Sequence, residues 1–232
     1  MTDGDDEPTK GNSEEGRLRQ PTDTGRVEAF SDGVFAIVIT LLVLDLHVPQ
    51  HPRGQLLAAL AQQWPAYLGY LASYMYVAVI WLNHHQAFKR IDRVDKGLQL
   101  ANLTVLFTTA LIPFPTAVLA QTFIEGIQSV DARTAVALYA GIAAVMCASW
   151  LLLYLAVADQ RLVEGHPERH AFSRDRGRAL IGMAAYTIAG VVGALAVPAI
   201  ALGIFLLLPL FYAVTSEGLM RPRARRNIVV RG

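Results

Sequence analysis

The 232-residue chain is 53% hydrophobic and only 17% charged, whereas about a quarter of the residues in an ordinary soluble domain carry a charge. Residues 179–216 contain no Asp, Glu, Lys or Arg at all. These features exclude a soluble globular domain and predict an integral membrane protein surrounded by the lipid bilayer. The net charge of +1 gives no indication of a nucleic-acid partner.

Residues 1–25, which precede the first apolar stretch, are polar and acidic. They contain seven acidic and three basic side chains among many Gly, Pro, Ser and Thr residues, a composition typical of disordered segments. The segment has neither the basic start nor the apolar middle of a signal peptide. We therefore expect a disordered tail, and a first membrane helix that also serves as the insertion signal.

Five apolar stretches are long enough to cross a membrane, which takes roughly twenty helical residues. They cover residues 27–48, 64–83, 98–121, 134–157 and 179–216. The last would be about 57 Å long as a single helix, nearly twice the thickness of the hydrocarbon core, and Pro198 marks the expected break. The sequence thus predicts an all-α membrane protein with six transmembrane helices in a domain over 26–216, followed by a basic tail, 217–232.

The basic residues predict how these helices are oriented. If both termini lie on one side, that side holds the segments 84–97 and 159–178 as loops, and it contains eighteen of the twenty Lys and Arg residues. Only Arg53 and Arg133 fall on the other side. Because Lys and Arg gather on the cytoplasmic side of membranes, both termini are predicted to be cytoplasmic. A five-helix count would place the arginines of the C-terminal tail outside.

The first stretch presents a bulky apolar stripe when it is drawn as a helix. Ile37, Leu41 and Leu44 fall within about 60° of one another on the helical wheel. Phe30 and Val48 extend the same stripe.

Polar side chains occupy other parts of this helix. Ser31 and Asp32 point more than about 110° away from the stripe, whereas Thr40 flanks it at about 60° and Asp45 at about 80°. An ionisable group at membrane depth is costly unless it faces protein or water. Asp32 is therefore expected to accept hydrogen bonds from a neighbouring helix, and Asp45, near the outer end, to reach water. Candidate partners at the depth of Asp32 are Trp81, Asn83, His84, His85 and Asn102.

Two features predict how the later helices are built. Pro113 and Pro115 are expected to break backbone hydrogen bonds in the third stretch. Ala185, Ala189 and Gly193 recur at a spacing of four residues in the fifth helix and predict close packing within one subunit.

Nothing in the sequence indicates catalysis or metal binding. It contains no nucleophile elbow, no phosphate-binding Gly loop and no carboxylate pair, so an enzyme is not expected. The single cysteine, Cys147, excludes an intrachain disulfide. His84 and His85 diverge by about 100° on a helix without further ligands at suitable spacing, so they are interpreted as membrane-interface residues rather than metal ligands.

Three segments carry a resemblance to a known family. Arg26 and Phe30-Ser31-Asp32 form the pattern R-x-x-x-F-S-D, which continues as GVFAIVITLLVLDL; WLNHHQAFKRID and LANLTVLFTTALIPFPTAVL follow. These segments resemble transmembrane protein 175, the endolysosomal potassium channel, and its bacterial relatives. The resemblance implies a homotetrameric cation channel in a bacterial-type cell membrane, with one six-helix repeat per subunit. The first helix would line a central pore that favours K⁺ over Na⁺.

The resemblance also implies roles for individual residues. Ile37, Leu41 and Leu44 would form the apolar layers of a constriction that acts as a hydrophobic gate, with the hydroxyl of Thr40 beside it. Asp45 would concentrate monovalent cations at the outer mouth. The network that braces the first helix would comprise Arg26, Phe30, Ser31, Asp32, Trp81, His84, His85 and Asn102.

The chain has no filter loop of the TVGYG kind, so its selectivity is expected to be weak and to arise at the apolar constriction. No cofactor is implied beside the permeant K⁺. An alternative function stays open, namely a proton-conducting channel or a proton-coupled transporter in which Asp32, Asp45 and the histidines relay protons.

Overall fold

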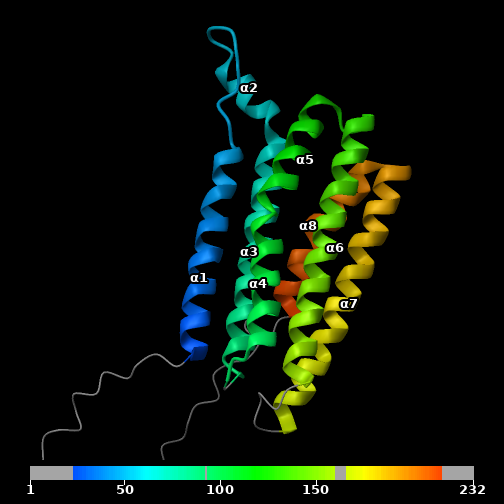
Figure 1. Ribbon diagram of the computed structural model, residues 1–232. Helices are drawn as coiled ribbons and strands as arrows, with labels where there is room; N and C mark the ends of the chain where they lie inside the picture. Colours follow the sequence, from blue (N-terminus) through cyan, green and yellow to red (C-terminus); the bar gives the residue numbers. More distant parts are fainter. Residues whose placement is uncertain (1–22, 92, 160–165, 216–232) are drawn as a thin grey trace, which may run out of the picture.

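The computed structural model describes residues 23–91, 93–159 and 166–215, and the regular secondary structure in these ranges is entirely helical (Figure 1). The helices are α1 (Asp23–Leu41), α2 (Leu56–Gln62), α3 (Trp64–Phe88), α4 (Lys96–Ala110), α5 (Pro113–Gly126), α6 (Val130–Asp159), α7 (His166–Leu195) and α8 (Pro198–Thr215). A 3₁₀ turn, η1 (Leu42–Asp45), extends α1.

The helices form a bundle with α1 at one edge and α7 at the opposite edge (Figure 1). α1 packs mainly on α3 and α4, whereas α3 also contacts α5 and α8. α6 packs along α7 and also contacts α4, α5 and α8. The short α2, in which no residue is buried, stands beyond one end of the bundle. α3 therefore connects the α1 edge to the rest of the molecule.

Within the described ranges, five helical segments have the length and composition to cross a membrane. They are Thr24–Asp45, Trp64–Phe88, Lys96–Gly126, Val130–Ala158 and Asp175–Leu195, and Pro198–Tyr212 is a shorter apolar helix. Each overlaps one of the predicted stretches. The chain is therefore a multi-pass helical membrane protein.

The prolines stand where the predicted breaks occur. α4 ends at Ala110 and α5 begins at Pro113, while α7 ends at Leu195 and α8 begins at Pro198. Pro113 and Pro198 each occupy the first position of a helix, where a missing backbone N–H removes no hydrogen bond. Both predicted interruptions are confirmed.

Other boundaries were predicted wrongly. Residues 166–178, expected in a loop, form the first turns of α7. Charged side chains alone do not end a helix, because a helix end needs a residue such as Gly or Pro, or a group that satisfies its free backbone hydrogen-bonding groups. Residues 23–25, expected in the disordered tail, begin α1, and Val48 lies in an extended segment after the helix. The predicted tails otherwise fall in 1–22 and 217–232, outside the described residues.

Close packing between α6 and α7 depends on glycine. Lipid tails are as apolar as leucine, so membrane helices associate through close contact rather than through hydrophobic burial. A Cβ atom at Gly190 would overlap the Cβ of Ala140, and one at Gly193 would overlap Val136 and Ala201. Gly193 and Ala189 belong to the predicted small-residue row, and both are buried.

Gly190→Ala should lower the thermal unfolding midpoint of the detergent-solubilised protein, because the added methyl group pushes α7 away from α6 at a cost of about 1–3 kcal/mol. Gly141→Ala is the matched control, since a Cβ there meets nothing within 4 Å. That control should leave the midpoint unchanged or raise it, because Ala favours helix more than Gly. Equal midpoints for the two variants would contradict the close contact at Gly190.

Candidate functional site

The bulky stripe predicted on the first helix faces outward from the chain. Ile37, Leu41 and Leu44 are 60%, 42% and 67% exposed, whereas the other face of the helix is buried against α3 and α4. That buried face includes Phe35 and Leu42, each 1% exposed. From Phe35 onward α1 is therefore apolar on both sides, and the described part of the chain covers only one of them.

Thr40 and Phe30 lie on the same outer face. The Thr40 hydroxyl donates to the Ile37 carbonyl at 2.8 Å and is exposed. This bond uses the hydroxyl hydrogen and leaves the oxygen able to accept from, or coordinate, a passing group. Phe30 is 58% exposed near the start of the helix.

A hydrogen-bonded chain ties the buried side of α1 to α3 and α4. Asn102 Nδ2 donates to Ser31 Oγ at 3.0 Å, and Ser31 Oγ donates to the Val27 carbonyl at 2.8 Å. The Asn102 Oδ1 atom lies 2.7 Å from His84 Nε2. Since Oδ1 can only accept, His84 carries its proton on Nε2, and its buried Nδ1 has no partner. All three side chains, Ser31, His84 and Asn102, are at most 1% exposed.

Two further contacts join α1 to α3 beside this chain. Trp81 Nε1 donates to Asp32 Oδ1 at 2.8 Å, and His85 Nδ1 donates to Glu28 Oε1 at 2.6 Å. The Trp81 and His85 rings stack at a centroid distance of 5.7 Å. Both carboxylates of this part of α1 therefore face protein.

The structure brings together most of the residues proposed for the bracing network, with two exceptions. Arg26 is exposed and makes no hydrogen bond or ion pair with any other described residue. Phe30 belongs to the outer face and braces nothing within the chain. In addition, His84 is fully buried, with its ring against Phe35 and Phe88.

Glu28 was not predicted as a member of this network. It precedes Asp32 by four residues, so both side chains lie on one face of the helix. The four-residue spacing was the sequence signal that could have placed Glu28 in the network. Asn83, a candidate partner of Asp32, lies instead on the other side of α3, where it lines a separate cavity.

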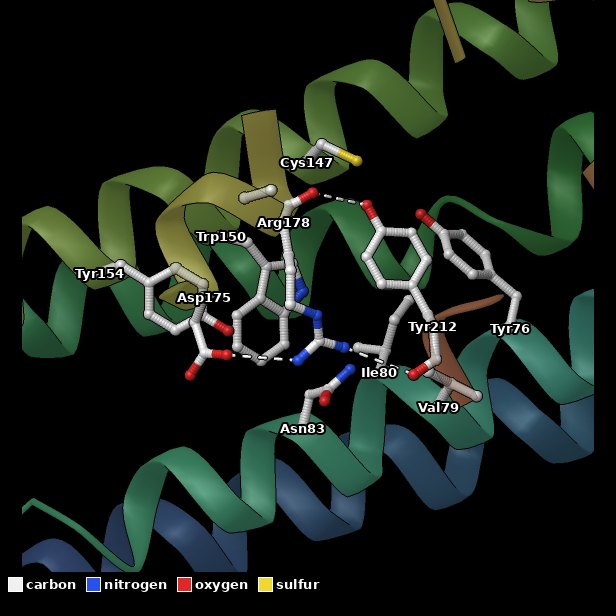
Figure 2. A pocket seen from close by; sticks show the side chains of 11 residues that line it. Tyr76, Val79, Ile80, Asn83, Cys147, Trp150, Tyr154, Asp175, Arg178 and Tyr212 are labelled. Atoms are coloured by element: carbon white, nitrogen blue, oxygen red, sulfur yellow. Dashed lines mark hydrogen bonds and ion pairs between the residues drawn. The ribbon is translucent and has the colours of Figure 1, made fainter. Parts of the chain in front are cut away.

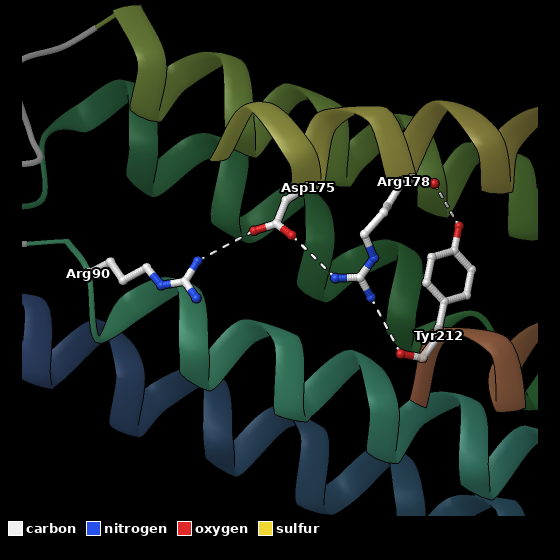
Figure 3. A network of polar contacts seen from close by, with 4 residues as sticks. All are labelled: Arg90, Asp175, Arg178 and Tyr212. Atoms are coloured by element: carbon white, nitrogen blue, oxygen red, sulfur yellow. Dashed lines mark hydrogen bonds and ion pairs between the residues drawn. The ribbon is translucent and has the colours of Figure 1, made fainter. Parts of the chain in front are cut away.

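That cavity adjoins a second polar cluster, formed by the C-terminal end of α3 with α7 and α8 (Figure 3). Arg90 lies 3.5 Å from one Asp175 oxygen, and Arg178 lies 3.2 Å from the other. Arg178 also donates to the Tyr212 carbonyl at 3.4 Å, and the Tyr212 hydroxyl donates to the Arg178 carbonyl at 2.9 Å. The expected loop over 159–178 concealed this cluster from sequence reasoning.

Figure 2 shows the cavity beside these residues, of about 50 Å³. Cavities that admit benzene are near 150 Å³, so an organic ligand does not fit here. Gly182 packs directly against the Tyr212 ring, because any Cβ would overlap it. The cluster therefore fastens α7 and α8 to the face of α3 opposite α1. The cavity is lined by Tyr76, Val79, Ile80, Asn83, Cys147, Trp150, Tyr154, Asp175, Arg178, Ala179 and Tyr212.

At the other end of α1, Asp45 is half-buried rather than free in water. Its Oδ2 atom is inaccessible and has no hydrogen-bond partner, and the neighbouring His47 donates to the Asp45 carbonyl at 2.8 Å. A cavity of about 360 Å³ beside it is also lined by Gln63, Gln121 and Glu125. The expectation that Asp45 simply reaches into water was therefore incomplete. Across the described ranges, no three His, Cys, Asp or Glu side chains gather as metal ligands.

Taken together, a bundle of membrane-length helices whose edge helix keeps an apolar face uncovered by the described residues defines a multi-pass helical membrane protein. Comparison with known proteins gives its family. The sequence profile described as "Endosomal/lysosomal potassium channel TMEM175" matches residues 26–113. A protein named a potassium channel from Chamaesiphon minutus is 36% identical over 203 residues, which cover 85% of this chain and 97% of that protein. The chain belongs to the TMEM175 family.

A solved structure agrees with this assignment. The crystal structure of a lysosomal potassium-selective channel TMEM175 homolog from Chamaesiphon minutus superposes with a TM-score of 0.73 at 34% identity, over 84% of this chain and 98% of that one. Other matches are partial. The chain spans about half the length of two other bacterial relatives. A Bos taurus protein named endosomal/lysosomal proton channel TMEM175 is 39% identical over 104 residues, 40% of this chain and 22% of that protein.

Asn102→Ala should lower the unfolding midpoint strongly, because it leaves His84 and Ser31 with buried groups unpaired, at about 1–3 kcal/mol for each. Gln99→Ala, an exposed position one turn earlier on α4, is the control and should change the midpoint little. Thermal unfolding in detergent measures both. A midpoint for Asn102→Ala that matches the control would show that the hydrogen-bonded chain is not needed for stability.

Proposed function

We propose that the chain is one subunit of a potassium-permeable, weakly selective cation channel whose pore is lined by the outer face of α1. The observation that carries this proposal is the exposure of Ile37, Leu41 and Leu44 beside a buried opposite face. Closed rotational symmetry lets one uncovered patch per subunit meet its copies around an axis. Four copies would bury this stripe around a central passage, with α8 as the sixth crossing and both termini cytoplasmic.

The side chains of the stripe would set how ions pass. Layers of leucine and isoleucine side chains around the axis would form a passage from which water leaves readily. Such loss of water is how hydrophobic constrictions gate. The sequence contains no TVGYG-like segment that could form a carbonyl-lined filter. Discrimination between K⁺ and Na⁺ would therefore depend on the cost of removing water from the ion, which is higher for Na⁺ than for K⁺. The Thr40 hydroxyl oxygen, free to accept, supplies a polar contact next to this passage. Asp45, which lines the cavity of about 360 Å³ at this end of α1, would attract cations at the outer mouth.

Leu41→Ser should increase potassium flux into liposomes that contain the purified protein, and should reduce the preference for K⁺ over Na⁺, because the hydroxyl group keeps the passage wet. Leu100→Ser is the matched control, since Leu100 is 68% exposed on α4 and does not belong to the stripe. It should leave flux and preference unchanged. Flux that responds equally to both substitutions, or to neither, would argue against α1 as the pore lining.

Asp32 would act as a brace and not as an ion ligand, since it faces Trp81 on the covered side of α1. Asp32→Ala should therefore reduce the yield of assembled protein or the total flux while the K⁺ to Na⁺ ratio stays as in the wild type. Size-exclusion chromatography and flux assays on the same preparation measure both quantities. A changed ion preference in well-assembled protein would move Asp32 into the permeation path.

Proton conduction is the second candidate. It is favoured by the Glu28–His85 contact, a titratable pair beside Asp32 in the same buried network, and by the printed name of the Bos taurus relative. A pH gradient applied to the same liposomes separates the two functions. Flux driven only by the proton gradient and indifferent to Leu41→Ser would favour proton transfer, and Glu28→Gln should then abolish it.

A further inference from the structure

A groove of about 770 Å³ opens between the first turns of α1 and α4. Apolar side chains form part of its wall, with Phe30 58% and Leu103 45% exposed. Arg26 and Lys96, both exposed, stand on its rim. The groove is lined by Arg26, Val27, Phe30, Val94, Asp95, Lys96, Gln99, Asn102 and Leu103.

The cations at this end lack partners among the described residues. Arg26 and Lys96 make no ion pair or hydrogen bond there, and neither do the nearby Lys89 and Arg93. The one acidic residue of the groove, Asp95, caps α4 by accepting from the Leu98 amide at 2.8 Å. The groove therefore presents exposed positive charge next to two apolar side chains.

The segment of the chain that precedes α1 carries the complementary negative charge. Residues 1–22 hold six Asp or Glu side chains against three Lys or Arg, a net charge of −3. They join directly to Asp23, the first residue of α1. Glu15 precedes Asp23 by eight residues, which in extended chain reach about 26 Å, while the helix from Asp23 to Phe30 is only about 10 Å long.

We propose that the acidic segment 1–22 docks in the groove of its own chain, with carboxylates paired to Arg26 and Lys96. Because the groove is formed by α1 on one side and α4 on the other, the docked segment fastens the first turn of α1 to α4. It also reduces the positive potential around the end of α1. That second effect rests on the proposed channel function, since a positive mouth lowers the local concentration of K⁺.

Disulfide trapping in the full-length protein tests the docking without any assumption about ion flux. In a Cys147→Ser background, which removes the only native cysteine, Glu15→Cys is combined with Gln99→Cys in the groove. The control pairs Glu15→Cys with Lys89→Cys, an exposed position at the same end of the bundle that does not line the groove. The rate of disulfide formation under mild oxidation is measured at about 10 mM and about 1 M salt, where the Debye length is about 30 Å and about 3 Å.

Docking predicts that the groove pair crosslinks about ten-fold faster than the control at low salt, and that high salt removes most of this difference. Lys96→Glu should slow the groove pair, and Glu14→Lys in that variant should restore part of the rate. Lys89→Glu places the same charge change outside the groove and should leave the rate within about two-fold. Crosslinking equal to the control, or unaffected by salt and by Lys96→Glu, would overturn the proposal.

Two other occupants give distinct results, and each would overturn docking of the chain on itself. Crosslinks formed between two copies would assign the groove to a neighbouring subunit. Loss of crosslinking on addition of phosphatidylglycerol, with the other five acidic residues of the segment intact, would assign it to a lipid headgroup.

Flux measurements then test the electrostatic effect. Replacing the six acidic residues of the segment by their amides should lower potassium flux at about 10 mM salt and leave it unchanged at about 1 M. Unchanged flux at both concentrations would overturn the electrostatic effect. If the groove pair crosslinks in protein that passes no ion, the docking proposal is upheld and the channel proposal is refuted. Failure of one proposal can therefore be told apart from failure of the other.

Discussion

The hydrogen bonds around Asn102 are the contacts on which the position of α1 depends. One amide side chain satisfies Ser31 on α1 and His84 on α3 while it is itself on α4, so three helices share a single buried polar junction. Because all three side chains are buried, loss of one partner leaves a buried polar group unpaired. The junction therefore fixes both the rotation of α1 and its depth. With that rotation fixed, Ile37 and Leu41 can only face outward.

The central helix α3 connects this junction to the remainder of the bundle. One of its faces holds α1 through Trp81, His84 and His85, and the opposite face meets the Arg178 cluster, which joins α7 and α8 (Figure 3). The two clusters have different chemistry. The first is a chain of mostly neutral hydrogen bonds, whereas the second contains two guanidinium groups around one carboxylate. α3 is thus held on both faces near one end of the bundle.

The features that follow from local periodicity could be predicted from the sequence. The outward stripe of α1 and the interruptions at Pro113 and Pro198 are of this kind, because helical geometry and the missing proline N–H act within a few residues. The Asp175 cluster could not be predicted, since its members are distant in sequence and α7 begins earlier than its apolar stretch. Glu28 and the exposure of Arg26 depended likewise on where α3 and α4 pack, which a helical wheel does not specify.

The 3₁₀ turn η1 at the C-terminal end of α1 has a geometric consequence for the stripe. A 3₁₀ helix turns 120° and rises about 2.0 Å per residue, against 100° and 1.5 Å for an α-helix. Between Leu41 and Leu44 the difference amounts to roughly 60° of rotation and about 1.5 Å of length. A change of helix type over these four residues would swing Leu44 around the helix axis while the buried junction at Ser31 stayed in place. The direction of Leu44 thus depends on the geometry of η1, which packs on α3 and α5, and not on the junction alone.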